Sequence, residues 1–362
     1  MSKPLIAVLL VAILSCRNAT AENYAILVSA GQVSSDDFDI EDEEENAITP
    51  EFWYDLYLAY ENLLLFEQYD SSKVYVFYGD GTDFDTTMDR YKKERHNWGQ
   101  ITDYDNSYNT LCSVMSSLDN IITDQDNVFF YWVVGHGMKT IPTNDDSYLA
   151  LIKHDNYYQE VNKTQLVNLI NSITHYNRRK IFWTTCKSGA MGGGLINPLN
   201  DRTVLLTSSS SNNNSFGFLD ADSILHTAFG YAYYVLSTRE FPFTAPYHNF
   251  EHVCQYYVNH DCDSLVSINE LYYGMVFFNY YFYLDLLPCL FDSGNISNSV
   301  FIGENKKIED VTIKSNSAYW IDELELSDVV IMNDKNVTID TDIQCVLKKN
   351  TFVPLSSTLI VK

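Results

Sequence analysis

Basic residues are scarce in this sequence. Its 362 residues include 23 Lys and Arg against 48 Asp and Glu, which gives a formal net charge of −25 at pH 7. Proteins that bind nucleic acids need clusters of Lys and Arg to displace counterions from the phosphates. The sequence therefore predicts no nucleic-acid partner, and its excess of acidic charge favours solubility outside the cell.

The sequence also lacks an apolar run long enough to cross a membrane, so no transmembrane segment is predicted. The apolar stretch at residues 5–14 follows Lys3 and precedes a small-residue cleavage site at residues 19–21. This order is typical of a signal peptide over residues 1–21, which implies a secreted or extracytoplasmic protein. A lipid anchor on Cys16 is the alternative, but Leu14 fits the required motif poorly.

None of the seven cysteines is spaced as Cys-x-x-Cys, so the sequence contains no zinc motif of that kind. What it does contain is strand-length apolar runs that alternate with helical patterns. Strands are predicted at residues 24–29, 73–78, 148–152 and 203–207 and in the runs that end at His136 and Cys186; helices are predicted from Thr49-Pro50 and over 111–122 and 166–173. This alternation indicates an α/β three-layer sandwich with a mostly parallel central sheet.

The character of the sequence changes near its C-terminal end. From about residue 304 the helical periodicity gives way to short alternating runs, and no internal repeat is evident. We therefore expect one large domain at residues 22–303 and a small all-β appendage at residues 304–362.

Two apolar runs each stop at a reactive side chain beside glycine: His136 before Gly137, and Cys186 before Ser188-Gly189. Sites in parallel sheets form at the carboxyl ends of the strands. There a histidine can take the proton of a thiol, and the backbone N–H groups of Gly137 and Cys186 can stabilise an oxyanion. A lone cysteine or histidine is more often structural, but their joint placement predicts a catalytic pair. Their separation, 186 − 136 = 50 residues, agrees with the roughly 50 of caspase-type proteases.

These residues resemble the legumain-like cysteine peptidases (family C13) of the caspase, gingipain and legumain clan, over about residues 24–302. The resemblance is carried by the two glycine turns, by the Gly-Asp-Gly-Thr-Asp segment at residues 79–83, and by residues 205–210. It implies a caspase-like fold and a metal-free His136/Cys186 dyad that acts on protein or peptide substrates. It also places Ser208 and Ser209 in the loop that lines the substrate pocket.

The sequence departs from the family pattern beside both catalytic candidates. Thr184-Thr185 stands where legumain-type enzymes have Glu-Ala, and Gly135 stands where many have Asp. The family's preference for asparagine substrates is therefore not carried over. Asp222 is a further candidate for the pocket by similarity to the pocket aspartate, and its alternative role is an aspartate at a helix start.

Residues 259–270 match a twelve-residue calcium loop of the EF-hand type. The oxygen ligands would come from Asn259, Asp261, Asp263, Ser267 and Glu270 and from the backbone carbonyl of Leu265. Ser264 replaces the usual glycine, and the alternative is an acidic loop that precedes a helix. Catalysis needs no cofactor, so any calcium here would be structural.

We therefore predict a secreted cysteine endopeptidase that forms an acyl-enzyme on Cys186. One alternative is a transpeptidase that uses the same dyad. The other is a catalytically inactive binding or surface protein with a caspase-like fold. The altered Thr184-Thr185 pair and the appendage, which we expect to associate with a cell surface, favour this second alternative.

Overall fold

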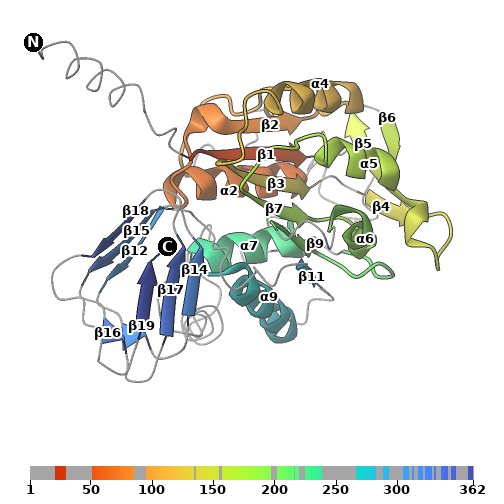
Figure 1. Cartoon of the computed structure of the whole chain (residues 1–362). Helices are drawn as coiled ribbons and strands as arrows, with labels where there is room; N and C mark the ends of the chain where they lie inside the picture. Colours follow the sequence, from red (N-terminus) through yellow and green to blue (C-terminus); the bar gives the residue numbers. More distant parts are fainter. Residues whose placement is uncertain are drawn as a thin grey trace, which may run out of the picture.

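The computed structural model contains a central sheet, helices on both of its faces, and a separate group of strands near the C-terminus (Figure 1). It describes residues 21–29, 51–84, 95–133, 136–154, 157–196, 202–215, 217–219, 225–238, 266–282 and 288–292, together with strands β12 to β19 between residues 305 and 361. No helix of the described part combines the length and hydropathy needed to cross a membrane.

The central sheet has six strands in the order β11-β8-β7-β3-β1-β2. They are β1 (Asn23–Ser29), β2 (Val74–Tyr78), β3 (Asn127–Val133), β7 (Arg178–Trp183), β8 (Thr203–Thr207) and β11 (Cys289–Asp292). All neighbours pair in parallel except β11, which runs antiparallel to β8. The predicted α/β sandwich with a mostly parallel sheet is confirmed, and β11 is an addition that its short sequence did not indicate.

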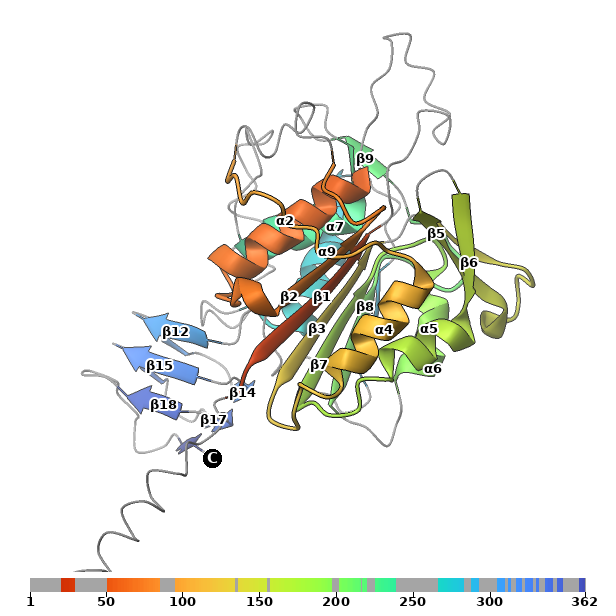
Figure 2. The same ribbon diagram turned by 90° about the horizontal axis from the view of Figure 1, so that it is seen from above.

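Helices cover both faces of this sheet (Figure 2). One face carries α2 (Glu51–Leu65), α7 (Ala228–Thr238) and α9 (Ile268–Phe282), and the other carries α4 (Tyr108–Leu118), α5 (Lys163–Ile170) and the short α6 (Gly192–Leu195). Side chains alternate between the two faces of the sheet along each strand. Because helices cover both faces, the central strands are apolar on both sides. Phe182 packs edge-on against Tyr233 of α7, 5.1 Å between ring centroids, whereas Trp132 stacks on Trp183.

A second, smaller sheet follows β3. It consists of β4 (His136–Lys139), β5 (Tyr148–His154) and β6 (Tyr157–Asn162), all antiparallel. The sequence pattern had predicted β5 but neither of its partners. It had also extended β3 to His136, whereas β3 ends at Val133 and His136 is the first residue of β4. The prediction was wrong because the apolar run continues beyond the last residue that pairs with β1.

The helix predicted at residues 111–122 is also shorter than expected. α4 ends at Leu118, and the backbone then turns so that Ile122 is buried while Ile121 is 53% exposed. Asp119 accepts hydrogen bonds from the backbone N–H and the hydroxyl of Thr174, which fixes the chain at this helix end. The apolar spacing predicted a helix that extends past Leu118 because a turn can bury an isoleucine as a helix does.

The C-terminal strands form a parallel solenoid. They are β12 (Asn305–Glu309), β13 (Thr312–Ile313), β14 (Ser317–Trp320), β15 (Glu323–Ser327), β16 (Val330–Ile331), β17 (Asn336–Asp340), β18 (Gln344–Leu347) and β19 (Thr358–Val361). Asn305 pairs with Glu323 and Glu323 with Gln344, so the coils are 323 − 305 = 18 and 344 − 323 = 21 residues long. The predicted all-β character is confirmed. The repeat of the coils was not foreseen, since their lengths differ and no fixed period shows in the sequence.

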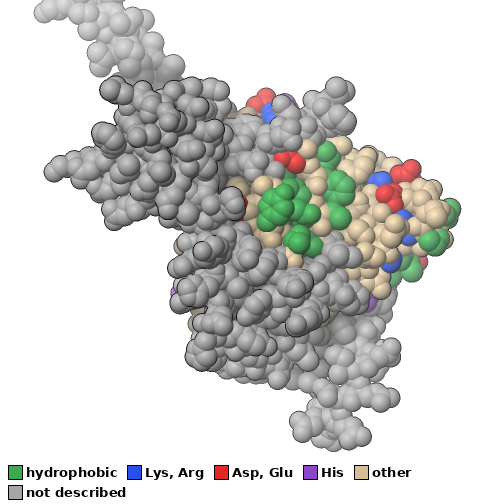
Figure 3. All heavy atoms as spheres, turned by 90° about the horizontal axis from the view of Figure 1, so that it is seen from below, with side chains coloured by type: hydrophobic (Ala, Val, Ile, Leu, Met, Phe, Trp, Pro, Cys, Tyr) green, Lys and Arg blue, Asp and Glu red, His purple; other side chains and the backbone are tan. Residues whose placement is uncertain are grey.

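Figure 3 views the molecule from below and shows several hydrophobic side chains at the surface, among mostly uncharged atoms. Large apolar side chains that are exposed in the described part include Tyr273 and Val276 on α9, Met138 in β4 and Ile141 just after β4. Single exposed apolar side chains are ordinary on a globular domain and imply no partner by themselves.

Candidate active site

The segments that carry His136 and Cys186 leave the central sheet from neighbouring strands. β3 and β7 pair in parallel, with Trp132 opposite Trp183 in the register. These two indole rings are fully buried and stack 4.6 Å apart at an interplanar angle of 5°. Just beyond them Thr184 N–H donates a hydrogen bond to the carbonyl of Trp132, 2.8 Å away. Both segments therefore emerge at the same edge of the sheet, where a site is expected.

Gly137 brings the two segments into contact. A β-carbon at this position would lie 2.1 Å from the carbonyl oxygen of Cys186 and 2.8 Å from Oγ1 of Thr185. No side chain fits in that space, so glycine is required here for close approach rather than for an unusual backbone angle. The residue that follows the exposed His136 thus packs against the backbone of Cys186, which is itself half-buried.

The thiol of Cys186 lies against the backbone of Ser215. Ser215 N–H points to the sulfur at a distance of 3.3 Å, and the thiol in turn lies 3.5 Å from the Ser215 carbonyl oxygen. Cys112, Cys186 and Cys289 all carry reduced thiols. An N–H group that points at sulfur stabilises negative charge on it, which suits a nucleophilic thiolate. Sequence reasoning missed Ser215, because it lies 29 residues beyond the cysteine and contributes only backbone atoms.

The predicted pocket residues Ser208 and Ser209 are fully buried beneath the turn that follows Cys186. Their hydroxyls donate to the Thr185 carbonyl at 3.2 and 3.1 Å. Gly189 N–H donates to the Ser209 carbonyl at 2.9 Å, which ties the far side of the turn to the same loop. The structure thus brings both serines to the site, where they support the turn that carries Cys186. Their role in a substrate pocket stays a prediction, and Asp222 lies outside the described residues.

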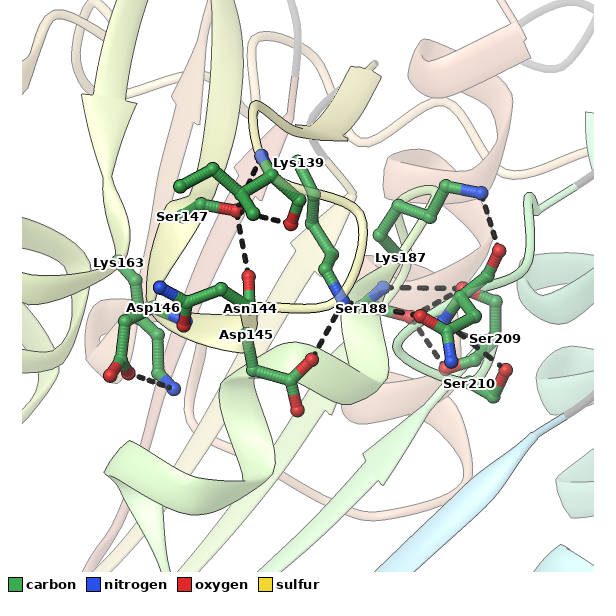
Figure 4. A network of polar contacts seen from close by, with 12 residues as sticks. Lys139, Asn144, Asp145, Asp146, Ser147, Lys163, Lys187, Ser188, Ser209 and Ser210 are labelled. Atoms are coloured by element: carbon green, nitrogen blue, oxygen red, sulfur yellow. Dashed lines mark hydrogen bonds and ion pairs between the residues drawn. The ribbon is translucent and has the colours of Figure 1, made fainter.

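Lys139 of β4 contacts the loop that follows β8 (Figure 4). The Nζ atom of Lys139 lies 2.7 Å from Oδ1 of Asp145 and 3.2 Å from Oδ1 of Asn212. Lys187, next to the cysteine, donates from Nζ to the backbone carbonyl of Asn212 at 2.6 Å. The hydrogen bond from Lys139 holds the pKa of Asp145 below its usual range. Asn212 therefore links the histidine strand to the cysteine turn.

Tyr148, the first residue of β5, lies next to the contact of Gly137 with Cys186. Its hydroxyl is 2.6 Å from Oγ1 of Thr185 and accepts a hydrogen bond from Nε1 of Trp183 at 3.1 Å. Burial raises the pKa of Tyr148 to about 12, so it is a neutral phenol at neutral pH. Sequence reasoning did not select Tyr148. The one signal was the hydroxyl of Thr185, where the family pattern has an alanine.

Only part of the predicted calcium loop is described. Asn259, Asp261, Asp263 and Leu265 lie outside the described residues. The carboxylate of Glu270 accepts hydrogen bonds from Ser267 N–H at 2.9 Å and from its hydroxyl at 3.0 Å, and Glu270 N–H donates to Oγ of Ser267. This reciprocal arrangement is a capping box at the start of α9. Within the described residues no group of three His, Cys, Asp or Glu is arranged to hold a metal. The calcium site stays a prediction.

Comparisons with known proteins add a likeness in fold. No family model matches the chain, and no curated protein matches it either. Among solved structures, caspase-1 from Spodoptera frugiperda is similar at 10% sequence identity and a TM-score of 0.39, over 76% of this chain and 91% of that chain. At this level the likeness concerns the general course of the chain and not the chemistry of the site. This likeness does not test the resemblance to the legumain-like peptidases.

Proposed function

We propose that this protein is a cysteine endopeptidase whose nucleophile is Cys186 and whose acid–base residue is His136. The observation that carries the proposal is the contact of Gly137 with the Cys186 carbonyl, where a β-carbon would approach to 2.1 Å. This contact joins the segment that carries the histidine to the segment that carries the thiol. Both segments lie at the carboxyl ends of neighbouring parallel strands, the usual place for a site in such a sheet.

In the proposed reaction, the Cys186 thiolate attacks the carbonyl carbon of a peptide bond and forms a tetrahedral intermediate. The proton of the thiol passes to His136, which then protonates the departing amine. Collapse of the intermediate breaks the C–N bond and leaves a thioester on Cys186. Water then attacks the thioester while His136 accepts a proton from the water, and the acid product and the thiol are released.

Backbone N–H groups supply the rest of the chemistry. Those of Gly137 and Cys186 are the proposed donors to the oxyanion. Ser215 N–H, 3.3 Å from the sulfur, stabilises the thiolate before attack. The proposed substrates are extracellular proteins or peptides, in keeping with the predicted signal peptide. None of these steps uses a metal ion or a cofactor.

The test is covalent labelling with a set of peptide acyloxymethyl ketones that differ in the residue before the reactive group. We expect the full chain to be labelled at Cys186 and to cleave matching fluorogenic peptides. Cys186→Ala should abolish both signals, and His136→Ala should abolish cleavage. Cys112→Ala is the matched control, because Cys112 is a half-buried thiol on α4, away from the site. Unchanged labelling of Cys186→Ala would refute the proposal.

A further inference from the structure

A directed chain of hydrogen bonds ends on the backbone of the proposed nucleophile. Trp183 Nε1 donates to the Tyr148 hydroxyl at 3.1 Å, the Tyr148 and Thr185 hydroxyls lie 2.6 Å apart, and the Thr185 hydroxyl donates to the Cys186 carbonyl at 3.2 Å. An indole N–H can only donate and a carbonyl can only accept. Thr185 uses its one hydroxyl hydrogen on Cys186, so Tyr148 must donate to Thr185.

This chain of hydrogen bonds holds a strained turn of the backbone in place. Lys187 adopts a left-handed conformation with φ 60° and ψ 17°, which is unfavourable for a residue with a side chain. Such strain persists only where the surroundings determine the conformation. Here the peptide unit between Cys186 and Lys187 is held at both polar ends: Thr185 donates to its carbonyl, and its N–H donates to the Asn213 carbonyl at 2.8 Å. Because the peptide unit is planar, these two bonds fix its orientation.

The same hydroxyls also contact the strand that carries the histidine. A β-carbon on Gly137 would lie 2.8 Å from Oγ1 of Thr185 and 2.9 Å from the hydroxyl of Tyr148. Tyr148 belongs to β5, whose residues Tyr148 to Leu151 pair with β4. One phenol therefore touches both halves of the site. Tyr148 and Trp183 are fully buried and Thr185 is 1% exposed, so water cannot replace the missing partner if one hydroxyl is removed.

We propose that Tyr148 and Thr185 are positioning residues, which hold the Cys186–Lys187 peptide and set the thiol relative to His136. This role rests on the proposed peptidase function. It also accounts for the threonine at position 185, directly before the proposed nucleophile. An alanine at position 185, as in the legumain pattern, could neither accept from Tyr148 nor donate to Cys186.

The test compares Tyr148→Phe, Thr185→Val, their combination and Thr185→Ser in the full chain. Two readouts are needed. The first is the rate at which iodoacetamide alkylates Cys186, followed by mass spectrometry of its peptide. The second is kcat and KM on the fluorogenic peptide that matches the best-labelling ketone. Each single variant should slow alkylation and lower kcat by about tenfold, with KM nearly unchanged. The double variant should be no worse than either single one, because both break the same chain. Thr185→Ser keeps the hydroxyl and should retain both rates.

Tyr176→Phe is the matched control. Tyr176 is also buried, and its hydroxyl lies 3.2 Å from Oγ1 of Thr203, but at the opposite edge of the sheet, before β7 and β8. Tyr176→Phe should lower the melting temperature without slowing alkylation of Cys186. If Tyr148→Phe does not fold, Thr185→Val and Thr185→Ser carry the comparison.

Two results would overturn the positioning role: equal slowing of alkylation by Tyr176→Phe and Tyr148→Phe, or unchanged alkylation and kcat in Tyr148→Phe and Thr185→Val. Either result leaves the peptidase function intact. A wild-type protein that cleaves no peptide and binds no ketone would instead refute the proposed function, whatever the alkylation rates of the variants.

Discussion

The backbone of Gly137 rests directly against the carbonyl oxygen of Cys186, and a β-carbon between them would approach to 2.1 Å. Gly137→Ala must therefore push the histidine strand away from the cysteine turn. We expect activity to fall by about a hundredfold, since displacements of this kind are costly at a catalytic site. Cleavage of a fluorogenic peptide and the melting temperature would be measured together.

Gly193→Ala is the control for this prediction. Gly193 lies in α6, and the nearest atom to an added β-carbon is Nζ of Lys163 at 3.9 Å, which is ordinary contact. The variant should keep full activity and be as stable as the wild type or slightly more so, because alanine favours a helix. Full activity in Gly137→Ala would contradict the packing described for the site.

Asp55 and His226 form a buried pair that joins α2 to the strand β10 (Leu225–Thr227). Oδ1 of Asp55 lies 3.1 Å from Nδ1 of His226, both side chains are fully buried, and Oδ2 accepts from Thr227 N–H at 2.9 Å. Asp55→Ala should lower the free energy of unfolding by about 3 kcal/mol, because it removes the buried carboxylate that His226 and Thr227 contact. Urea unfolding measures this change.

The matched control is Asp124→Ala. Asp124 lies 3.3 Å from Nδ1 of His175, but the two side chains are 67% and 56% exposed. Exposed ion pairs contribute little to stability because water screens them. The control should therefore leave the urea midpoint almost unchanged. A loss in Asp55→Ala no larger than in the control would show that the buried pair is not a structural anchor.

The effect of pH on Asp145 tests the link made by Lys139. Because Lys139 holds its pKa low, Asp145 contributes stability above its unfolded pKa of about 3.9, and this contribution is lost as the pH falls through the lower folded pKa. Lys139→Met should raise the pKa of Asp145 toward its usual value, which a carboxyl-detected NMR titration would measure. Lys163→Met is the comparison variant: it should raise the pKa of Asp145 less, since Lys163 binds the neighbouring Asp146 at 3.1 Å and acts on Asp145 only through its more distant charge. An unchanged pKa in Lys139→Met would contradict the ion pair.

Two variants distinguish calcium binding by the loop at residues 259–270 from the capping of α9 by Glu270. Glu270→Ala removes the capping box and should lower stability by about 1 kcal/mol without added metal. If the predicted loop binds calcium, millimolar calcium should raise the melting temperature of the wild type but not that of Asp261→Ala. Isothermal titration that shows no binding at millimolar calcium would rule out the site.

The sequence was informative where burial follows a local period. The central strands and α2, α4 and α5 were predicted because apolar residues recur at strand or helix spacing. α7 was missed for a physical reason: residues Ala228–Leu236 are all buried, so the helix has no polar face and no period to detect. The solenoid was missed because its parallel pairs join residues about 20 positions apart, in coils of unequal length.

At the candidate site, His136 and Cys186 were selected because an apolar run that stops at a reactive side chain beside glycine is a local sequence pattern, and their catalytic roles stay a prediction. Ser215 and Tyr148 could not, since their contacts with the cysteine turn arise only when distant segments pack together. The departure at Thr185 marked the right place in the sequence, but its meaning depended on a tyrosine 37 residues earlier.

His136 begins β4 of the small antiparallel sheet, whereas Cys186 follows β7 of the central sheet. We predict that the small sheet opens locally while the central sheet stays folded, at a lower free energy than global unfolding. In rising urea, cleavage activity should vanish before the far-ultraviolet circular dichroism changes. The fraction of chains that are folded and the fraction that are competent for the proposed cleavage would then be two separate quantities.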